Sequence, residues 1–168
     1  MTTRPQLHYE DVEVGAEIPP LVKVPTTIAL VRYCAAANDF SPIHFDEPYA
    51  RTRGMKSVIV QGFFKAACLG QLLTDWAGPK GWVKKFATKY ARINVPHEPM
   101  TCRGRVTRKY AEAEGHLVDV EMWLENGKGE VTTTGRATVL LPSRRGADTP
   151  VLDGRGSNGT QGEQEGTQ

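Results

Sequence analysis

The chain has 168 residues, of which 39% are hydrophobic and 24% are charged, and its formal net charge is +2. This size and composition indicate one globular domain whose core is large enough to fold without disulfides or a structural metal. The small charge does not indicate nucleic-acid binding, and no run approaches the ~18 apolar residues of a membrane span.

The N-terminus and the cysteines indicate the cellular compartment. No apolar run follows the first arginine, Arg4, so a secretory signal is not predicted. Cys34, Cys68 and Cys102 are odd in number and lack CxxC spacing, which favours free thiols in a reducing compartment. We therefore expect a cytoplasmic protein with neither a nucleic-acid nor a membrane partner.

The first elements in the chain are an edge strand and a helix. The stretch PPLVKVPTT, residues 19–27, predicts an edge strand, because prolines flank it and cannot donate to a central ladder. A helix is predicted over residues 28–37, with Thr26 or Thr27 as its cap. Its apolar positions fall on one face at helical spacing: Ile28, Val31 and Ala35.

Two further helices follow. The stretch DEPYARTRG predicts a short helix, with Asp46 as N-cap, Pro48 in the first turn and Gly54 at the end. The stretch FFKAACLGQLLTDWAG predicts a longer helix that opens at Gly62 and stops at Gly78. This longer helix is apolar over most of its circumference, so we expect it in the centre of the domain.

Four strand-like segments decide the fold class: residues 82–95, 101–113, 116–126 and 131–142. The last two are joined at Asn126-Gly127, which is a hairpin signal. One strand, a long apolar helix and then antiparallel strands predict an α+β domain with an antiparallel sheet wrapped around a long central helix, the hot-dog fold.

The composition changes after residue 142. Residues 143–168 contain six glycines, no aromatic residue and few apolar ones, so they cannot bury enough surface to offset their ordering entropy. We expect one folded domain over residues 1–142 and a disordered Gly-rich polar tail over residues 143–168.

The stretch NDFSPIHFDEPYA, residues 38–50, holds two ionisable side chains five positions apart, Asp39 and His44. On spacing alone, a polar turn that contains a histidine explains them better than catalysis does. Pro42 fixes the backbone between them and restricts Ser41 to an extended conformation. A loop stiffened in this way suits a carboxylate and an imidazole that hold one water molecule, as the addition of water to an activated double bond requires.

Such chemistry also needs a site for the negative charge on a thioester oxygen. In the stretch VIVQGFF, Gly62 opens the long apolar helix. A helix N-terminus offers unpaired N–H groups and the positive end of a dipole, and glycine lets an acyl group approach the backbone closely.

The stretch YCAAANDFSPIHFDEPYA resembles the motif of the MaoC-like dehydratases and R-specific enoyl-CoA hydratases. That motif runs roughly Tyr, several small residues, Gly-Asp-x-Asn-Pro-Ile-His-x-Asp, then Ala. YEDVEVGAEIPP is similar to the family's N-terminal segment, IVQGFF to its His-Gly-Met stretch, and GRATVLLP to its last strand. The resemblance covers about residues 9 to 142.

The resemblance implies a role for several residues. Asp39 and His44 would form the dyad that binds the water, and the backbone of Gly62 would donate to the thioester oxygen; Ser41 and Gln61 join Gly62 as oxyanion or substrate-binding candidates. The chain departs from the common pattern at four positions: Asn38 replaces glycine, Ser41 asparagine, Gln61 histidine and Gly70 a serine that helps to orient the dyad in several hydratases. Glycine at position 70 would also widen the pocket for a bulkier acyl group.

The resemblance implies hydration of a trans-2-enoyl-CoA, or the reverse dehydration of an R-3-hydroxyacyl-CoA, with coenzyme A thioester as substrate and with neither a metal nor a redox cofactor. One alternative is a weakly or non-catalytic hot-dog subunit that binds acyl-CoA or completes a heteromeric hydratase. A second is an acyl-CoA thioesterase, which would not need this dyad.

Two further stretches bear on partners. TDWAGP resembles a segment in the small catalytic subunit of hydratases that act on steroid side chains, although a helix C-terminus explains it as well. Six basic residues suit either the phosphates of coenzyme A or a solvated face: Arg51, Arg53, Lys56, Lys84, Lys85 and Lys89. We expect edge strands, with the strand over 82–95 nearby, to join two chains into a homodimer or a heteromer with another MaoC-like chain.

Overall fold

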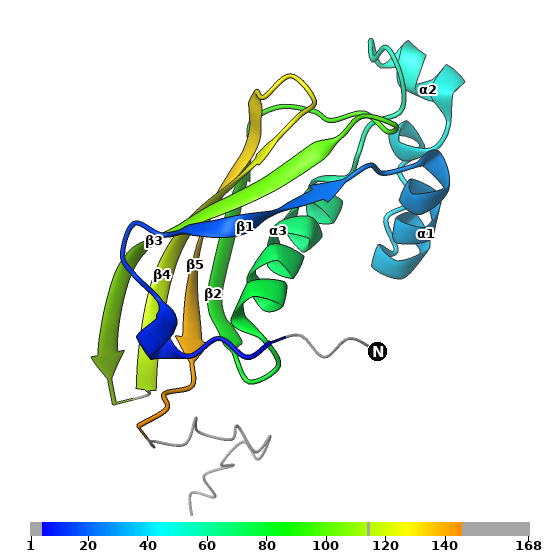
Figure 1. The fold of residues 1–168 in the computed structure, drawn as a ribbon. Coiled ribbons are helices and arrows are strands. Elements are labelled where there is room, and N and C mark those ends of the chain that lie inside the picture. The colour runs from blue at the N-terminus through cyan, green and yellow to red at the C-terminus, as the bar shows by residue number, and fades with distance from the viewer. Residues whose placement is uncertain (1–4, 114, 146–168) are drawn as a thin grey trace, which may run out of the picture.

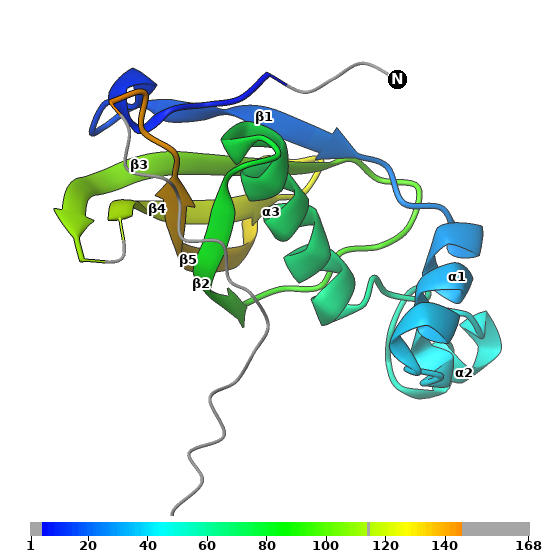
Figure 2. The ribbon, with the colours of Figure 1, turned by 90° about the horizontal axis from the view of Figure 1, so that it is seen from below.

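The computed structural model describes residues 5–113 and 115–145. Its elements are η1 (Tyr9–Asp11), β1 (Glu17–Lys23), α1 (Thr27–Ala37), η2 (Pro42–His44), α2 (Glu47–Thr52), α3 (Gly62–Ala77), β2 (Trp82–Tyr90), β3 (Met100–Glu112), β4 (Gly115–Glu125) and β5 (Val131–Leu141). The strands form one antiparallel sheet in the order β1-β3-β4-β5-β2. The sheet curves around α3 (Figure 1), and Figure 2 shows the helix against its inner face. The expected α+β hot-dog architecture is therefore confirmed.

Helix α3 forms the centre of the core. Leu69, Leu72 and Leu73 are at most 2% exposed and pack in one cluster with the inner side chains of the sheet. The helix begins at Gly62 and ends at Gly78, as predicted. Gly78 has a φ of +79°, and a Cβ there would lie 2.8 Å from the carbonyl oxygen of Pro5, so glycine is needed to stop the helix. No helix within the described residues is long and apolar enough to cross a membrane.

Helix α1 is capped as predicted, but the predicted apolar face is not the buried one. The Thr26 side chain accepts a hydrogen bond from the backbone N–H of Ala29. The buried residues are Leu30 and Cys34, whereas Ile28 is 65% exposed and the rest of its face, Val31 and Ala35, is exposed too. The reason is the position of the helix: α1 and α2 lie beyond one end of the sheet (Figures 1 and 2), so only one narrow side of α1 meets the core.

The strand predictions hold in number and order and differ in length. β1 is an edge strand as predicted, and β2 is the other edge strand. β2 ends at Tyr90, not at residue 95. The β4–β5 connection is a longer turn than Asn126-Gly127 suggests, because the backbone N–H of Asn126 donates to Glu130 and the left-handed conformation falls on Gly129.

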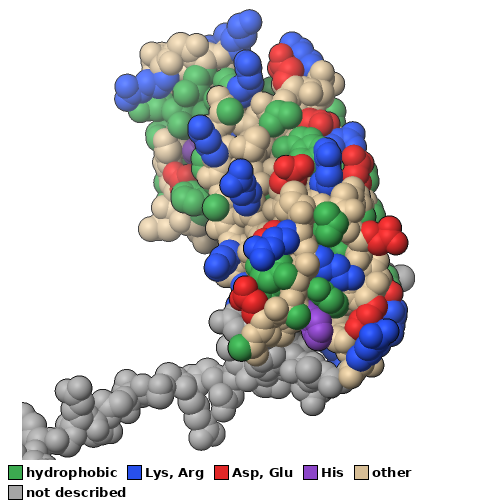
Figure 3. Space-filling view, turned by 90° about the vertical axis from the view of Figure 1, so that its left-hand side faces the viewer, with side chains coloured by type: hydrophobic (Ala, Val, Ile, Leu, Met, Phe, Trp, Pro, Cys, Tyr) green, Lys and Arg blue, Asp and Glu red, His purple; other side chains and the backbone are tan. Residues whose placement is uncertain are grey.

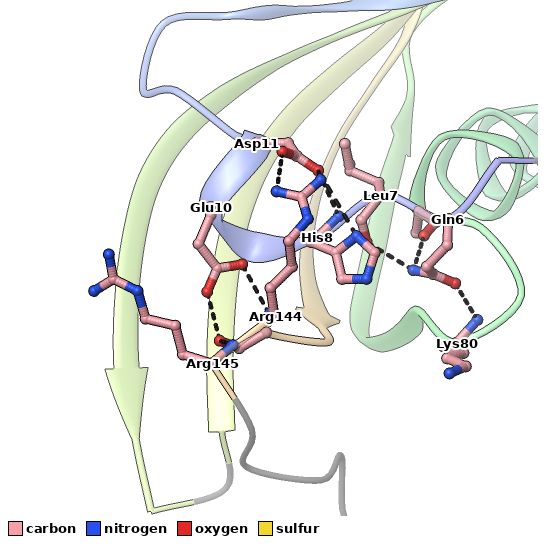
Figure 4. Close-up of polar contacts among 10 residues, drawn as sticks. Gln6, Leu7, His8, Glu10, Asp11, Lys80, Arg144 and Arg145 are labelled. Atoms are coloured by element: carbon pink, nitrogen blue, oxygen red, sulfur yellow. Dashed lines mark hydrogen bonds and ion pairs between the residues drawn. The ribbon is translucent and has the colours of Figure 1, made fainter.

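The two ends of the described chain meet beside η1 (Figure 4). Arg144 forms a bidentate ion pair with Asp11, with N–O distances of 2.6 and 2.7 Å. The Ser143 hydroxyl donates to Glu10 and, with the Glu10 backbone, lowers the pKa of that carboxyl to about 2. Residues 143–145, which the sequence assigns to the tail, thus contact the folded domain. Residues 146–168 of the expected tail lie outside the described residues.

Candidate active site

The Asp39–His44 loop begins at a sharp turn where α1 ends. Asn38 has a φ of +52° and lies in the left-handed region, and its N–H donates to the carbonyl of Cys34. The N–H of Asp39 donates to the same carbonyl, at 3.0 Å. Asparagine is among the few non-glycine residues that tolerate this backbone. The replacement of the motif's glycine by Asn38 therefore keeps the turn that directs the chain from α1 into η2.

His44 is buried and fixed in one orientation. Pro42 opens η2 and His44 ends it, and only 7% of His44 is exposed. Its Nδ1 lies 2.8 Å from the carbonyl oxygen of Ile59, so Nδ1 carries the proton and donates. In return, the N–H of Ile59 donates to the carbonyl of Ile43 at 3.0 Å. These two bonds attach the loop to the segment that leads into α3, and in the tautomer that carries its proton on Nδ1 the Nε2 atom is an acceptor.

Asp39 lies opposite that free nitrogen. Its Oδ2 is 3.7 Å from Nε2 of His44, which is too long for a good direct hydrogen bond. The Asp39 side chain is 37% exposed, whereas that of His44 is 8% exposed. A carboxylate and a neutral Nε2 are both acceptors, so one water molecule with two protons can donate to both. The structure thus brings the two predicted residues together, with geometry that suits a bound water.

Ser41 and Gln61 support this loop in ways that the sequence does not reveal. The backbone N–H of Ser41 donates to Oδ1 of Asp39 at 3.4 Å, a weak local contact. Gln61 is 1% exposed, and its Nε2 donates to the carbonyl of Leu30 at 3.0 Å and to Sγ of Cys34 at 3.2 Å. Gln61 therefore ties the start of α3 to α1, and its contacts are those of a positioning residue.

Gly62 is the first residue of α3, and the ring of Tyr90 leaves little room for a side chain there. A Cβ at this position would lie 3.2 Å from the ring of Tyr90. The first N–H groups of a helix have no acceptor within the helix. Because Ile59, which binds His44, is three residues before Gly62, the structure connects the helix N-terminus directly to the dyad loop.

A buried cation lies one turn into the same helix. Lys65 is 3% exposed, and its Nζ donates to the carbonyl of Arg92 at 2.8 Å and lies 5.5 Å from the centre of the Tyr90 ring. Burial lowers the pKa of the Lys65 ammonium. A positive charge here adds to the field at the start of α3. Sequence reasoning missed Lys65, although a lysine inside the apolar run FFKAACLG is a signal for it.

Tyr33 is a second candidate that was missed. Its ring lies edge-on to Phe64, with 5.2 Å between the ring centres, and so links α1 to α3. Burial raises the pKa of the Tyr33 phenol, with smaller contributions from Tyr90, Cys68 and Asp39. The smallest of these contributions, from Asp39, places the side chain within electrostatic range of that carboxylate. The available signal was its place at the head of the motif, six residues before Asp39.

Each of the three candidate residues Asp39, His44 and Gly62 is followed directly by an exposed phenylalanine. Phe40, Phe45 and Phe63 are 59%, 38% and 68% exposed. Position 70, in contrast, offers room, because a Cβ on Gly70 would meet nothing within 4 Å.

Two hollows of about 590 and 530 Å³ lie away from the dyad, on the outer face of the sheet. Side chains of Glu121 and Arg136 line both, and Asp39, His44 and Gly62 line neither. They are open depressions in a charged surface, so the polar loop is the better candidate for chemistry. Figure 3 shows Lys and Arg side chains interspersed with Asp and Glu over one side of the molecule.

The sheet around α3 and the loop at its end define a MaoC-like hot-dog domain. Residues 16–140 match the family model described as a MaoC like domain. The chain belongs to the MaoC-like dehydratase family.

Individual relatives agree with this assignment. The beta subunit of 3-oxo-4,17-pregnadiene-20-carboxyl-CoA hydratase from Mycobacterium tuberculosis (strain ATCC 25618 / H37Rv) is 31% identical over 134 residues, which are 78% of this chain and 96% of the relative. A chain of the ChsH1-ChsH2 complex from M. tuberculosis superposes with a TM-score of 0.68 at 24% identity, over 77% of this chain and 98% of that one. The (R)-hydratase from A. caviae involved in PHA biosynthesis superposes with a TM-score of 0.72 at 22% identity, over 79% of this chain and 99% of that one. Both structural likenesses show the hot-dog fold.

Proposed function

We propose that this chain hydrates a trans-2-enoyl-CoA, or dehydrates the corresponding R-3-hydroxyacyl-CoA. The observation that carries the proposal is the 3.7 Å spacing of Asp39 Oδ2 and His44 Nε2, with the other ring nitrogen fixed on Ile59. Membership of the MaoC-like dehydratase family supports the reaction class.

The geometry suggests how the step proceeds. The water oxygen forms a bond to Cβ of the enoyl group while the dyad takes one of its protons. The electrons of the double bond move towards the thioester oxygen, which the N–H of Gly62 stabilises together with the dipole of α3. The dyad then returns a proton to Cα, so it ends the cycle in its starting state. Addition of water involves no net oxidation or reduction, and the step needs no redox cofactor or metal.

We propose further that the acyl group is bulkier than a short straight chain. Space is open beside Gly70, where several hydratases have a serine, and exposed phenylalanines flank the dyad. A relative at 31% identity is named for a hydratase of a pregnadiene carboxyl-CoA. The relative in the ChsH1-ChsH2 complex is named for a complex of two proteins. We also propose that the working unit of this chain contains a second chain, and that the second chain has the same fold.

The test is an assay of the purified protein with crotonyl-CoA and with a bulky polycyclic enoyl-CoA. It measures two quantities, the loss of the conjugated absorbance and the release of free thiol. Loss of absorbance without thiol, faster on the bulky substrate, supports the proposal. Release of thiol identifies a thioesterase. Binding of both thioesters without turnover identifies a non-catalytic subunit. His116→Ala is the matched control for His44→Ala, because His116 lies in β4 beside Tyr9, away from the dyad.

A further inference from the structure

Lys65 is a buried cation without a carboxylate partner among the described residues. Its side chain is 3% exposed, and its Nζ donates to the carbonyl of Arg92 at 2.8 Å. The ion pairs among the described residues do not include it. Burial lowers the pKa of its ammonium, without an opposing contribution from a described carboxylate. A buried charge without a counter-ion destabilises the folded chain, so packing alone gives no reason for a lysine here.

The position of Lys65 in α3 adds to this cost. Lys65 lies three residues after Gly62, in the first turn of the helix. This turn is at the positive end of the helix dipole, where a further positive charge is repelled. Helical side chains tilt towards the N-terminus of the helix, so the ammonium lies back towards the start of α3. Burial and the dipole therefore both oppose the same charge.

One aromatic ring lies against both the ammonium and the backbone of Gly62. Nζ of Lys65 is 5.5 Å from the centre of the Tyr90 ring. A Cβ on Gly62 would lie 3.2 to 3.3 Å from atoms of that ring. Residues three apart in a helix lie on one face, with about 5–6 Å between their Cβ atoms. The charge of Lys65 is thus close enough to act on a group that binds the N–H of Gly62.

We propose that the positive charge of Lys65 stabilises the negative charge that develops on the thioester oxygen of the substrate, so that the reacting substrate supplies the missing counter-ion. This inference rests on the proposed function, because that reaction places an anion beside Gly62. The anion forms only as water adds to the double bond, so the attraction is stronger in the transition state than in the bound substrate. Lys65 acts through its charge and does not touch the substrate.

The test separates the charge of Lys65 from its packing. Lys65→Met keeps the length and the apolar stem and removes both the charge and the donor. Lys65→Gln removes the charge and keeps an N–H donor, and Lys65→Arg keeps the charge. Lys80→Gln, at an exposed lysine beyond the other end of α3, is the matched control for the loss of one positive charge. Circular dichroism and thermal melts check the fold of each variant.

Two readouts respond to the charge. The first is kcat and KM on the enoyl-CoA that the wild type turns over fastest. The second is the ratio of enolate to keto form of bound acetoacetyl-CoA, measured by the enolate absorbance at one fixed, mildly alkaline pH. Acetoacetyl-CoA forms its enolate by losing a proton from the carbon between its two carbonyls. The enolate therefore carries the same kind of charge as the reacting thioester, and it forms without turnover.

In Lys65→Met and Lys65→Gln we expect kcat to fall by about tenfold with little change in KM, and the enolate ratio to fall by about tenfold. The melting temperature should stay the same or rise, because both variants lose a buried charge that has no counter-ion. Lys65→Arg and Lys80→Gln should keep the enolate ratio of the wild type. A lysine that only held Arg92 in place would give a lower melting temperature and a larger loss in Lys65→Met than in Lys65→Gln.

Three results overturn the inference and leave the proposed function intact. They are an unchanged kcat and enolate ratio in Lys65→Met, an equal fall in Lys80→Gln, and a clear drop in the melting temperature of both neutral variants at position 65. A wild type that neither turns over an enoyl-CoA nor binds acetoacetyl-CoA overturns the proposed function, and this inference with it.

Discussion

The dyad end of the molecule and the end where residues 8–11 contact residues 143–145 are built differently. Around the start of α3, Gln61 and Asn94 are buried, and each has a side-chain oxygen without a hydrogen-bond partner among the described residues, while Lys65 is a buried cation. Beside η1, exposed charged groups form ion pairs, as in the Arg144–Asp11 pair, although Nδ1 of His8 is buried without a hydrogen-bond partner among the described residues. Buried polar groups that are incompletely paired cost stability and are retained at functional sites. The comparison predicts that changes at the dyad end alter turnover most, and that changes at the terminal end alter only stability.

The largest expected effect is on the dyad itself. Asp39→Asn and His44→Ala should each lower turnover by about 10²- to 10⁴-fold, because each removes a positioned acid or base. The melting temperature should change little for Asp39→Asn, whose side chain is partly exposed. Steady-state kinetics and thermal melts of the same preparations check both statements. Near wild-type turnover in either variant would disprove the dyad assignment.

Gln61→Leu should affect both stability and turnover. The change removes the hydrogen bonds that Gln61 donates to the Leu30 carbonyl and to Cys34, which costs about 1 kcal/mol, since the Leu30 carbonyl keeps its bond within α1. Because Gln61 holds α3 against α1, the dyad loop should also shift and turnover should fall. Urea unfolding measures the first effect. Gln71→Ala on the same helix is the control. An equal loss of stability and turnover in Gln71→Ala would show that Gln61 has no particular role in positioning α3 against α1.

Gly70→Ser should change selectivity with little change in stability. The position has room for a side chain, so the free energy of unfolding should stay within about 0.5 kcal/mol. The ratio of kcat/KM for the bulky over the short enoyl-CoA should fall by about tenfold if the open space receives the acyl group. An unchanged ratio would show that the space beside Gly70 does not receive the acyl group. Gly62→Ala, whose Cβ would press on Tyr90, is the destabilising counterpart.

The smallest effect belongs to the terminal end. Hydrogen bonds from Ser143 and the Glu10 backbone hold the pKa of Glu10 at about 2, below its ordinary 4.5, and Arg144 lowers the pKa of Asp11. Carboxyls with lowered pKa values stabilise the folded state above their unfolded pKa, and this contribution is lost as the pH falls from about 4.5 towards 2. Glu10→Gln should therefore lower the melting temperature slightly at pH 7 and not at pH 2. Turnover at pH 7 should be unchanged, and a clear loss would contradict the comparison.

Local signals in the sequence predicted much of the fold and part of the site. The cap at Asp46 and the helix limits at Gly62 and Gly78 depend on neighbours in the chain, and the structure has them where predicted. The buried side of α1 depends on where the helix meets the core, so the Ile28 face was assigned wrongly. The partners of Lys65 and Tyr33 are remote in sequence, on Arg92 and Phe64. Spacing alone does not reveal such contacts.

The double attachment between the loop and the segment before α3 has a consequence for how substrate range can change. Ile59 accepts from His44 and donates to Ile43, so two hydrogen bonds fix the position of His44 relative to the start of α3. The side chains of the phenylalanines that follow Asp39 and Gly62 are exposed, so packing does not fix them in the same way. Under the proposed function, we therefore expect substitutions at Phe40 or Phe63 to change which acyl group is accepted while the positions of His44 and Gly62 stay the same.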